Sequence, residues 1–222
     1  MACMSESRKI AVLIADVVKS REIDDREGLQ ENLKEELERV SKESENLVST
    51  PSIMRGDEIE VAHENALGCF LQFERLEDIL FPHRLKGGIG IGTFDTGIRE
   101  NVSEMDGPAF HLARDALKES KKTGGRSIVY IRSGNTEWDE LINTVLSLLS
   151  AVKEDWTRRE REISLFYLRN QSKTHEEISE YFDVSRPMVS KTLNSAHIKS
   201  VKAARNFLFK NLSSIEGVGE RM

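Results

Sequence analysis

Two short motifs near the C-terminus constrain the fold of this chain more than any other part of its sequence. Thr157 with Glu160, and Thr174 with Glu177, both follow the pattern Thr-x-x-Glu. In such a capping box the threonine hydroxyl accepts from an amide in the first helical turn, and the glutamate reaches back to the threonine amide. The motifs therefore predict one helix that ends near Asn170 and a second that ends near Phe182.

A turn and a third helix follow these two helices. We expect the turn at Asp183 and Val184, with Ser185 capping a helix that begins at Arg186. The stretch HEEISEYFDVSRPMVSKTL resembles the general helix-turn-helix pattern. Its small-residue position holds Ser179, and its apolar positions hold Ile178, Val184, Val189 and Leu193. Asp183 stands where glycine is usual, but aspartate tolerates left-handed backbone better than most residues. The preceding helix, RREREISLFYLRN, resembles the opening of a sigma-factor region-4-like domain.

The third helix of such a module lies in the major groove of DNA. The residues expected to face bases or phosphates there are Arg186, Met188, Ser190, Lys191 and Asn194. Further phosphate contacts are expected from Lys199, Lys202 and Arg205. The alternative is a small helical bundle whose basic face is only solvated. Against that alternative, the segment from Val184 to Leu212 carries six basic residues and no acidic one.

The charge of the chain divides along its length. Residues 157–222 contain 12 Lys/Arg and 8 Asp/Glu, a net +4, while the remainder contains 20 and 30, a net −10. Such a split suggests that the two parts have different partners, and double-stranded DNA is the partner expected for the basic part.

Several classes of protein are disfavoured. No apolar run approaches the roughly 18–20 residues of a membrane span, and the start MACMSESRKI lacks the apolar core of a secretory signal. Cys3 and Cys69 are the only cysteines, so a disulfide framework or a structural zinc site is disfavoured. We therefore expect a cytoplasmic, reduced protein.

The residues before the C-terminal module predict an α+β domain. The expected strands are Ile10–Asp16, Ser52–Met54, Ile59–Ala62, Lys86–Thr93 and Ser127–Ile131, and the expected helices are about Asp25–Leu47, Asn65–Leu80 and Pro108–Lys121. Thr50, Pro51 and Ser52 are expected to break the first helix. The order βαββαβαβ matches a split-βαβ, ferredoxin-like sheet. We divide the chain into this domain at residues 8–131, a connector or dimerisation helix at 137–153, and the helix-turn-helix domain at 157–210.

Two aspartates are expected to meet at one edge of that sheet. Asp16 ends the first strand and Asp57 lies in the predicted hairpin, which turns at the same edge. Carboxylates there suit Mg²⁺ or Mn²⁺ with a nucleotide phosphate as a further ligand. The phosphate is expected on the loop that precedes the first helix, at Val17, Lys19, Ser20 and Arg21. Either aspartate taken singly is more simply explained as a cap or turn residue.

Four motifs in this domain carry a family resemblance. DVVKSR, MRGDEIEVA, LKGGIGIGTFDTGI and DGPAFHLARDAL together resemble the SatD family and, more distantly, the palm domain of class III nucleotide cyclases and GGDEF proteins. The resemblance covers about residues 8–131, and the tail is similar to the helix-turn-helix that some SatD-like proteins carry. It implies that Asp16 and Asp57 match the two metal-binding aspartates of the cyclase palm.

The sequence also departs from the cyclase pattern. Ile53 stands where cyclases place a base-reading lysine, and His111 and Asp115 stand where they carry an asparagine and a transition-state arginine. Arg114 lies one residue, or about 100° around a helix, from the latter position. Three hypotheses remain: a transcriptional regulator that binds a metal and a nucleotide, an enzyme acting on nucleotides, and a DNA-binding protein whose palm is a degenerate dimerisation scaffold.

Overall fold

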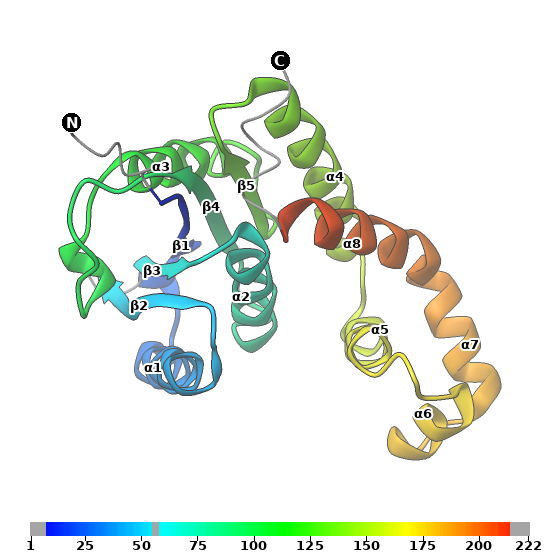
Figure 1. Cartoon of the computed structure of the whole chain (residues 1–222). Helices are drawn as coiled ribbons and strands as arrows, with labels where there is room; N and C mark the ends of the chain where they lie inside the picture. The colour runs from blue at the N-terminus through cyan, green and yellow to red at the C-terminus, as the bar shows by residue number, and fades with distance from the viewer. Residues whose placement is uncertain (1–7, 55–57, 214–222) are drawn as a thin grey trace.

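The computed structural model describes residues 8–54 and 58–213. Within them the chain forms five strands, eight α-helices and two short 3₁₀ helices. Up to the fifth strand the order is β-α-β-β-α-β-α-β, as the sequence predicts. The mixed α+β class is therefore confirmed (Figure 1).

One sheet contains all five strands. They are β1 (Ile10–Val17), β2 (Leu47–Met54), β3 (Glu58–His63), β4 (Leu85–Gly92) and β5 (Ile128–Arg132). Their order across the sheet is β2-β3-β1-β4-β5. Neighbours are antiparallel except β4 and β5, which are parallel. The most apolar strand, β1, thus lies at the centre, where both of its faces are covered.

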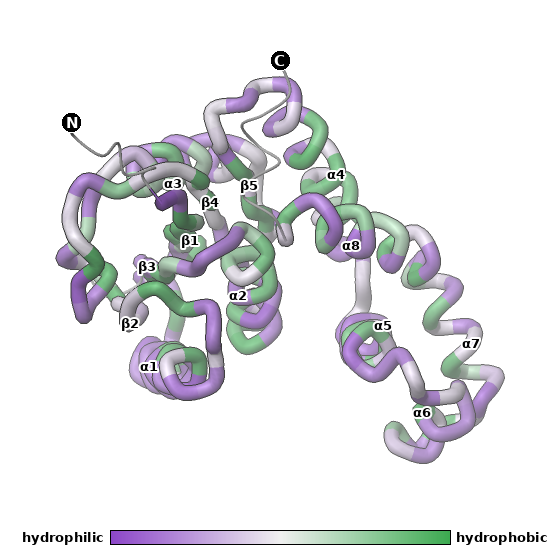
Figure 2. The backbone as a smooth tube through the Cα atoms, in the orientation of Figure 1, coloured by the Kyte–Doolittle hydropathy of each residue, from purple (hydrophilic) through white to green (hydrophobic). Residues whose placement is uncertain are grey.

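Helices cover both faces of this sheet. They are α1 (Arg26–Glu43), α2 (Ala66–Ile79) and α3 (Pro108–Ser120). Leu13 and its odd-numbered neighbours in β1 share one buried cluster with α1 and α2. Val12 and its even-numbered neighbours share a second cluster with α3. The alternation of side chains along a strand therefore distributes the apolar run of β1 between two layers. Figure 1 shows α1 and α2 on one side of the sheet and α3 on the other, and Figure 2 shows the hydropathy of the same backbone.

Glycines in β4 let α3 approach the sheet closely. A Cβ added at Gly90 would lie 2.0 Å from the carbonyl oxygen of Ala109, and one at Gly88 would lie 2.1 Å from that of Ala113. No side chain fits in either place. The glycines of the GGIGIG stretch are therefore explained by the close packing of α3 on the strand.

One boundary prediction is wrong. Helix α1 ends at Glu43, well before Leu47, and Thr50, Pro51 and Ser52 lie inside β2 instead of breaking a helix. Strand β2 is at the edge of the sheet, where a proline without an amide hydrogen is tolerated. Its pairing with β3 also shifts register on either side of Ser49.

The remaining helices form what we call the helical part. They are α4 (Thr136–Glu154), α5 (Arg158–Arg169), α6 (His175–Tyr181), α7 (Arg186–Ser195) and α8 (Ile198–Leu212). Helix α4 contacts both β5 and α8. One buried apolar cluster runs from the sheet through Leu146 of α4 to Ile163 of α5 and Leu193 of α7. The helical part is therefore packed onto the sheet part (residues 10–132).

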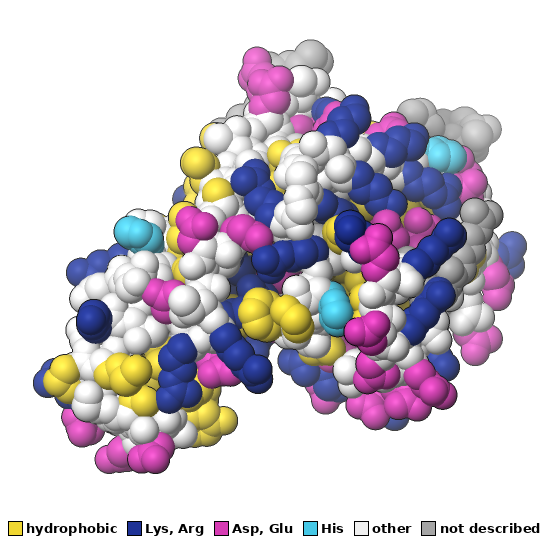
Figure 3. All heavy atoms as spheres, turned by 180° about the vertical axis from the view of Figure 1, so that it is seen from behind, with side chains coloured by type: hydrophobic (Ala, Val, Ile, Leu, Met, Phe, Trp, Pro, Cys, Tyr) yellow, Lys and Arg dark blue, Asp and Glu magenta, His cyan; other side chains and the backbone are white. Residues whose placement is uncertain are grey.

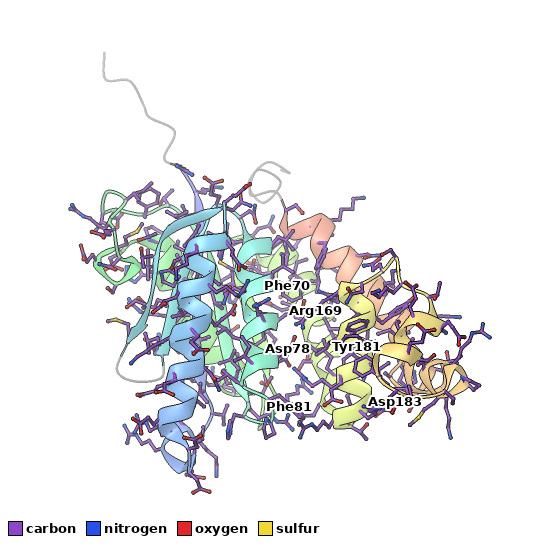
Figure 4. The ribbon with its side chains drawn as sticks, turned by 90° about the horizontal axis from the view of Figure 1, so that it is seen from below. Phe70, Asp78, Phe81, Arg169, Tyr181 and Asp183 are labelled. Carbon is purple, nitrogen blue, oxygen red and sulfur yellow. The ribbon has the colours of Figure 1, made fainter. Side chains whose placement is uncertain are left out.

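Charged side chains also cross this boundary. The carboxylates come from α2: Glu74, Glu77 and Asp78. The cations that pair with them are Lys153 of α4, Arg161 and Arg169 of α5, and Arg205 of α8. We call these seven residues the boundary ion cluster. Figure 4 shows Asp78 and Arg169 on the two sides of the boundary, and Figure 3 shows basic side chains gathered along the hollow between the parts.

Candidate functional site

Both predicted capping boxes are present in the helical part. The Thr157 hydroxyl accepts from the Glu160 amide at 3.2 Å, and the Glu160 carboxylate accepts from the Thr157 amide at 2.9 Å. Thr174 and Glu177 repeat this arrangement at 3.3 and 2.7 Å. Donation from the Thr174 backbone lowers the pKa of Glu177. Helices α5 and α6 therefore begin where the sequence predicts.

The turn between α6 and α7 has the expected geometry. Asp183 has a φ of 50°, in the left-handed region that the sequence analysis allows for it. The Val184 amide donates to the Ser179 carbonyl oxygen at 2.9 Å, and the Ser185 hydroxyl accepts from the Met188 amide at 3.4 Å. Ile178 of α6 is fully buried, as is Val189 of α7, so these two helices pack through the apolar positions that the pattern requires.

One face of α7 is open to solvent. The Arg186 side chain is 68% exposed and has only a loose ion pair with Glu176, at 3.9 Å. Met188 is 45% exposed, Lys191 and Asn194 are also exposed, and Ser190 is half-buried. Four of the five residues expected to face bases or phosphates are thus exposed, and α7 itself contains no acidic residue.

The three expected phosphate contacts belong to a separate helix. Helix α7 ends at Ser195, and His197 takes a left-handed φ of 51° before α8 begins. On α8, Lys199 is exposed, while the Lys202 ammonium lies 5.9 Å from the centre of the Tyr167 ring. The Arg205 guanidinium lies 2.7 Å from Glu74 in the boundary ion cluster. Arg205 therefore serves the boundary between the parts, and we remove it from the expected DNA contacts.

Asp16 lies near the C-terminal end of the central strand β1, opposite the start of β3. Asp16 pairs in register with Glu58 of β3 on one side and with Lys86 of β4 on the other. The Asp16 carboxylate is 2.5 Å from the Lys121 ammonium. Asp57 lies outside the described residues, one position before Glu58. Within residues 8–54 and 58–213 no group of three or more His, Cys, Asp or Glu side chains is placed to hold a metal ion.

The expected phosphate loop takes a different form. Val17 is the last residue of β1, and residues Ser20–Glu22 form a 3₁₀ helix. Lys19 pairs with Glu22 at 2.8 Å, Ser20 is buried and Arg21 is exposed. Helix α1 begins only at Arg26, and Asp25 already caps it by accepting from the Gly28 amide. The expected phosphate loop thus leads into α1 through a 3₁₀ turn, and the Gly28 amide at the start of α1 already has a partner in Asp25.

The residues that depart from the cyclase pattern have partners of their own. Arg114 reaches the buried Glu60 at 3.6 Å, and burial raises the pKa of that carboxyl although Arg114 partly offsets it. Asp115 pairs with Lys118, His111 lies 4.0 Å from Asp106, and Ile53 pairs with Ile59 between β2 and β3. The sequence analysis missed Glu60, whose signal is an acidic residue inside an apolar strand.

Lys86 is a second residue that the sequence analysis missed. It is 3% exposed, and its ammonium donates to the Thr123 hydroxyl at 2.9 Å. Burial lowers the pKa of Lys86 to about 8. Within the described residues no carboxylate lies within ion-pair distance of it.

The fold and these features define an α+β protein whose helical part carries a capped helix pair with an exposed basic helix. A model of the SatD family matches residues 10–210, so the chain belongs to the SatD family. The match covers the helical part as well as the sheet part, and thus extends well beyond the resemblance seen at residues 8–131. No curated protein matches the chain. In the described residues no helix is both long and apolar enough to span a membrane.

Proposed function

We propose that this protein is a cytoplasmic, DNA-binding transcriptional regulator whose sheet part binds a nucleotide together with a divalent metal. The observation that carries the proposal is the exposed face of α7, which follows a short capped helix and a left-handed turn. A helix presented in this way can enter the major groove without moving the rest of the fold.

The proposed DNA contacts fall into two groups. Lys191 and Asn194 have the donors that read base edges, and Arg186 can pair with guanine. Met188 offers an apolar contact and Ser190 a hydroxyl. Lys199 and Lys202 would contact phosphates from the start of α8. Helix-turn-helix proteins commonly read paired half-sites, so we propose that the chain acts as a homodimer.

The proposal for the sheet part rests on topology. The order β2-β3-β1-β4 with antiparallel neighbours supports a split-βαβ, ferredoxin-like palm. Asp16 is the register partner of Glu58, and Asp57 directly precedes Glu58 in the sequence. Asp16 and Asp57 would then supply the hard oxygen ligands that Mg²⁺ or Mn²⁺ prefers. Lys19 and Arg21 would bind phosphate through their side chains, beside the same strand end.

DNA binding is tested by selecting a preferred duplex from a random library and titrating it with salt. Lys191→Ala and Asn194→Ala should each cost about 1–3 kcal/mol on the preferred site and much less on random DNA. Lys42→Ala removes an exposed lysine on α1 and serves as the matched control. If the wild type selects no sequence and binds random duplex no better than residues 8–131 of the chain do, the proposal is wrong.

Metal-dependent nucleotide binding is tested by calorimetry with nucleoside triphosphates and Mg²⁺ or Mn²⁺. Asp16→Asn and Asp57→Asn should each abolish it, while Asp115→Asn, at an exposed aspartate on α3, should leave it unchanged. Unchanged nucleotide affinity in both Asp16→Asn and Asp57→Asn would show that these two residues do not form the site. Formation of a new nucleotide product, without DNA binding, would instead support an enzyme.

A second candidate function is that of a DNA-binding protein whose palm is a degenerate dimerisation scaffold, and it has one specific observation in its favour. The Lys121 ammonium already neutralises Asp16 at 2.5 Å, as expected if the palm is a degenerate scaffold. In that case wild type and Lys121→Ala would both fail to bind any nucleotide. Tighter metal-dependent binding by Lys121→Ala would instead show that a cation competes with Lys121 for Asp16, in favour of the first proposal.

A further inference from the structure

Helix α4 has two apolar faces, and the second is only partly covered inside the chain. Ile142, Leu146 and Leu149 are buried in the core. Leu141 and Leu148, in contrast, are 53% and 65% exposed. They are seven residues apart, so they lie about 10 Å from each other along nearly the same line of the helix.

A groove adjoins these exposed leucines. It has a volume of about 300 Å³ and runs between α4 and α8. Val145, Leu148 and Val152 line it from α4, and Ala204 and Phe207 line it from α8. None of its lining residues is charged. The same face of α4 therefore offers both projecting apolar side chains and an apolar recess, which is the combination that a self-complementary two-fold interface requires.

Charges at the two ends of this face favour a second copy of the chain as its occupant. Glu137, exposed and one helical turn before Leu141, gives the beginning of α4 a negative charge. Lys199, exposed and next to the groove-lining Ser200, adds a positive charge near the other end, where the exposed Asp155 adds a negative one. Two α4 helices packed antiparallel would bring Glu137 of each copy near Lys199 of the other, and that pair favours a second copy as the occupant.

We propose that two copies of this chain associate through the exposed face of α4 and the α4/α8 groove, with their α4 helices antiparallel and crossing near Val145. Leu141 of each copy then lies beside Leu149 of the other and enters its groove. Glu137 of each copy lies beside Lys199 of the other. The proposal rests on the dimer proposed above for paired half-sites. It concerns a surface that contains none of the proposed base-reading residues, and shares with the proposed DNA contacts only Lys199.

The test measures the mass of the full chain in solution without DNA, by light scattering and sedimentation at micromolar concentration. The wild type should be a dimer. Leu141→Glu and Leu148→Glu should each raise the dimer Kd at least about thirtyfold, because each places a charge at the centre of the interface. Both residues are exposed in the single chain, so at protein concentrations below the dimer Kd the thermal unfolding of the variants should match that of the wild type.

Two further variants make the test specific. Ile98→Glu introduces the same charge at another apolar residue, 49% exposed, and should leave the dimer intact. Glu137→Lys should weaken the dimer, and addition of Lys199→Glu to it should restore the association. A monomeric wild type, or a dimer that survives both leucine variants, would overturn the proposal. Because no DNA is present, either result leaves the DNA-binding proposal to its own experiment.

Discussion

Two contacts in this chain are stabilised in different ways: the packing of α3 against β4, and the boundary between α2 and the helical part. Helix α3 lies on β4 through glycines, with backbone against backbone and no charged group between Gly90 and Ala109. At the boundary, three carboxylates of α2 meet one lysine and three arginines of the helical part. The first contact is fixed by volume and the second by charge.

The difference bears on how each contact responds to change. Close packing has no alternative arrangement of similar free energy, so α3 should stay in place for as long as the sheet is folded. A buried ion cluster gains little net stability, because desolvation of the charges offsets their attraction. Its main effect is to specify which charges meet. The boundary is therefore the place where an orientation can be fixed without a large contribution to the free energy of unfolding.

The largest expected effect comes from removing one cation from the boundary ion cluster. Lys153 is 7% exposed and pairs with Glu77 and Glu74. Burial disfavours the ammonium, but the carboxylates of Glu77 and Glu74 outweigh it and raise the pKa of Lys153. Among the described residues, Lys153→Ala leaves Glu77 with only Arg161, at 3.7 Å, while Glu74 keeps Arg205. The loss of the nearest cation of Glu77 should lower the free energy of unfolding by up to about 3–5 kcal/mol in urea denaturation.

A double variant separates net stability from broken pairing at this position. Lys153→Met with Glu77→Met removes both charges and should recover most of the loss. Lys42→Ala, at an exposed surface pair, is the control and should change the free energy of unfolding little. A small loss in Lys153→Ala would mean that water reaches the cluster in solution.

The next effect tests the packing side. Gly90→Ala places a methyl group 2.0 Å from the Ala109 carbonyl oxygen, and α3 must shift to make room. We expect a loss of about 3 kcal/mol in the free energy of unfolding, the upper end for overpacked sites, because the obstacle is backbone. Gly97→Ala is the control, since nothing lies within 4 Å of its added Cβ. Equal stability of the two variants would show that α3 is not held by close approach.

The parts of the fold that the sequence predicts are those with local causes. The starts of α5 and α6 follow from hydrogen bonds between residues three apart, and the left-handed turn follows from Asp183 itself. The break between α7 and α8 was not predicted, because its left-handed residue is His197, with neither glycine nor proline beside it.

The parts that escaped prediction depend on residues distant in sequence. Arg205 has all the features of a phosphate-binding arginine, and its contact with Glu74, 131 residues away, gives it a structural role that its neighbours in sequence do not reveal. Pro51 signals a helix break in the sequence, but its place on an edge strand depends on the strand order of the whole sheet. The proposed metal pair stays a prediction, because Asp57 lies outside the described residues.

A smaller effect concerns the helical part itself, where polar caps replace tight packing. Helix α6 has only seven residues, so its start is a large share of its hydrogen bonding. Thr174→Ala removes the hydroxyl of its capping box and should cost about 1 kcal/mol. Thr144→Ala, inside α4, removes a hydroxyl that only bonds back to the Glu140 carbonyl, and should be neutral or slightly stabilising. Hydrogen exchange at α6 would measure the local loss if global unfolding does not.

The smallest expected effect concerns an exception inside the apolar sheet part. His63 of β3 is 3% exposed, and neither ring nitrogen meets hydrogen-bond geometry with a described residue. Burial lowers the pKa of His63 below the ordinary 6.5, and the Asn46 backbone offsets only part of that. As the pH falls below about 6.5, the unfolded chain takes up a proton that the folded chain refuses. The stability present at higher pH is therefore lost progressively as the pH falls toward the folded-state pKa.

His63→Leu sharpens this last point, because it removes the proton-binding ring while keeping the site filled. Since the ring nitrogens have no partner to lose, the variant should be about as stable as the wild type at pH 8. Between pH 6.5 and 5 its stability should fall less than that of the wild type. Glu60, whose pKa burial raises, acts with the opposite sign in both proteins, so the difference between them isolates His63. Parallel curves in chemical denaturation over that range would mean that the ring finds a hydrogen-bond partner in solution, and that the sheet part is less strictly apolar than its packing indicates.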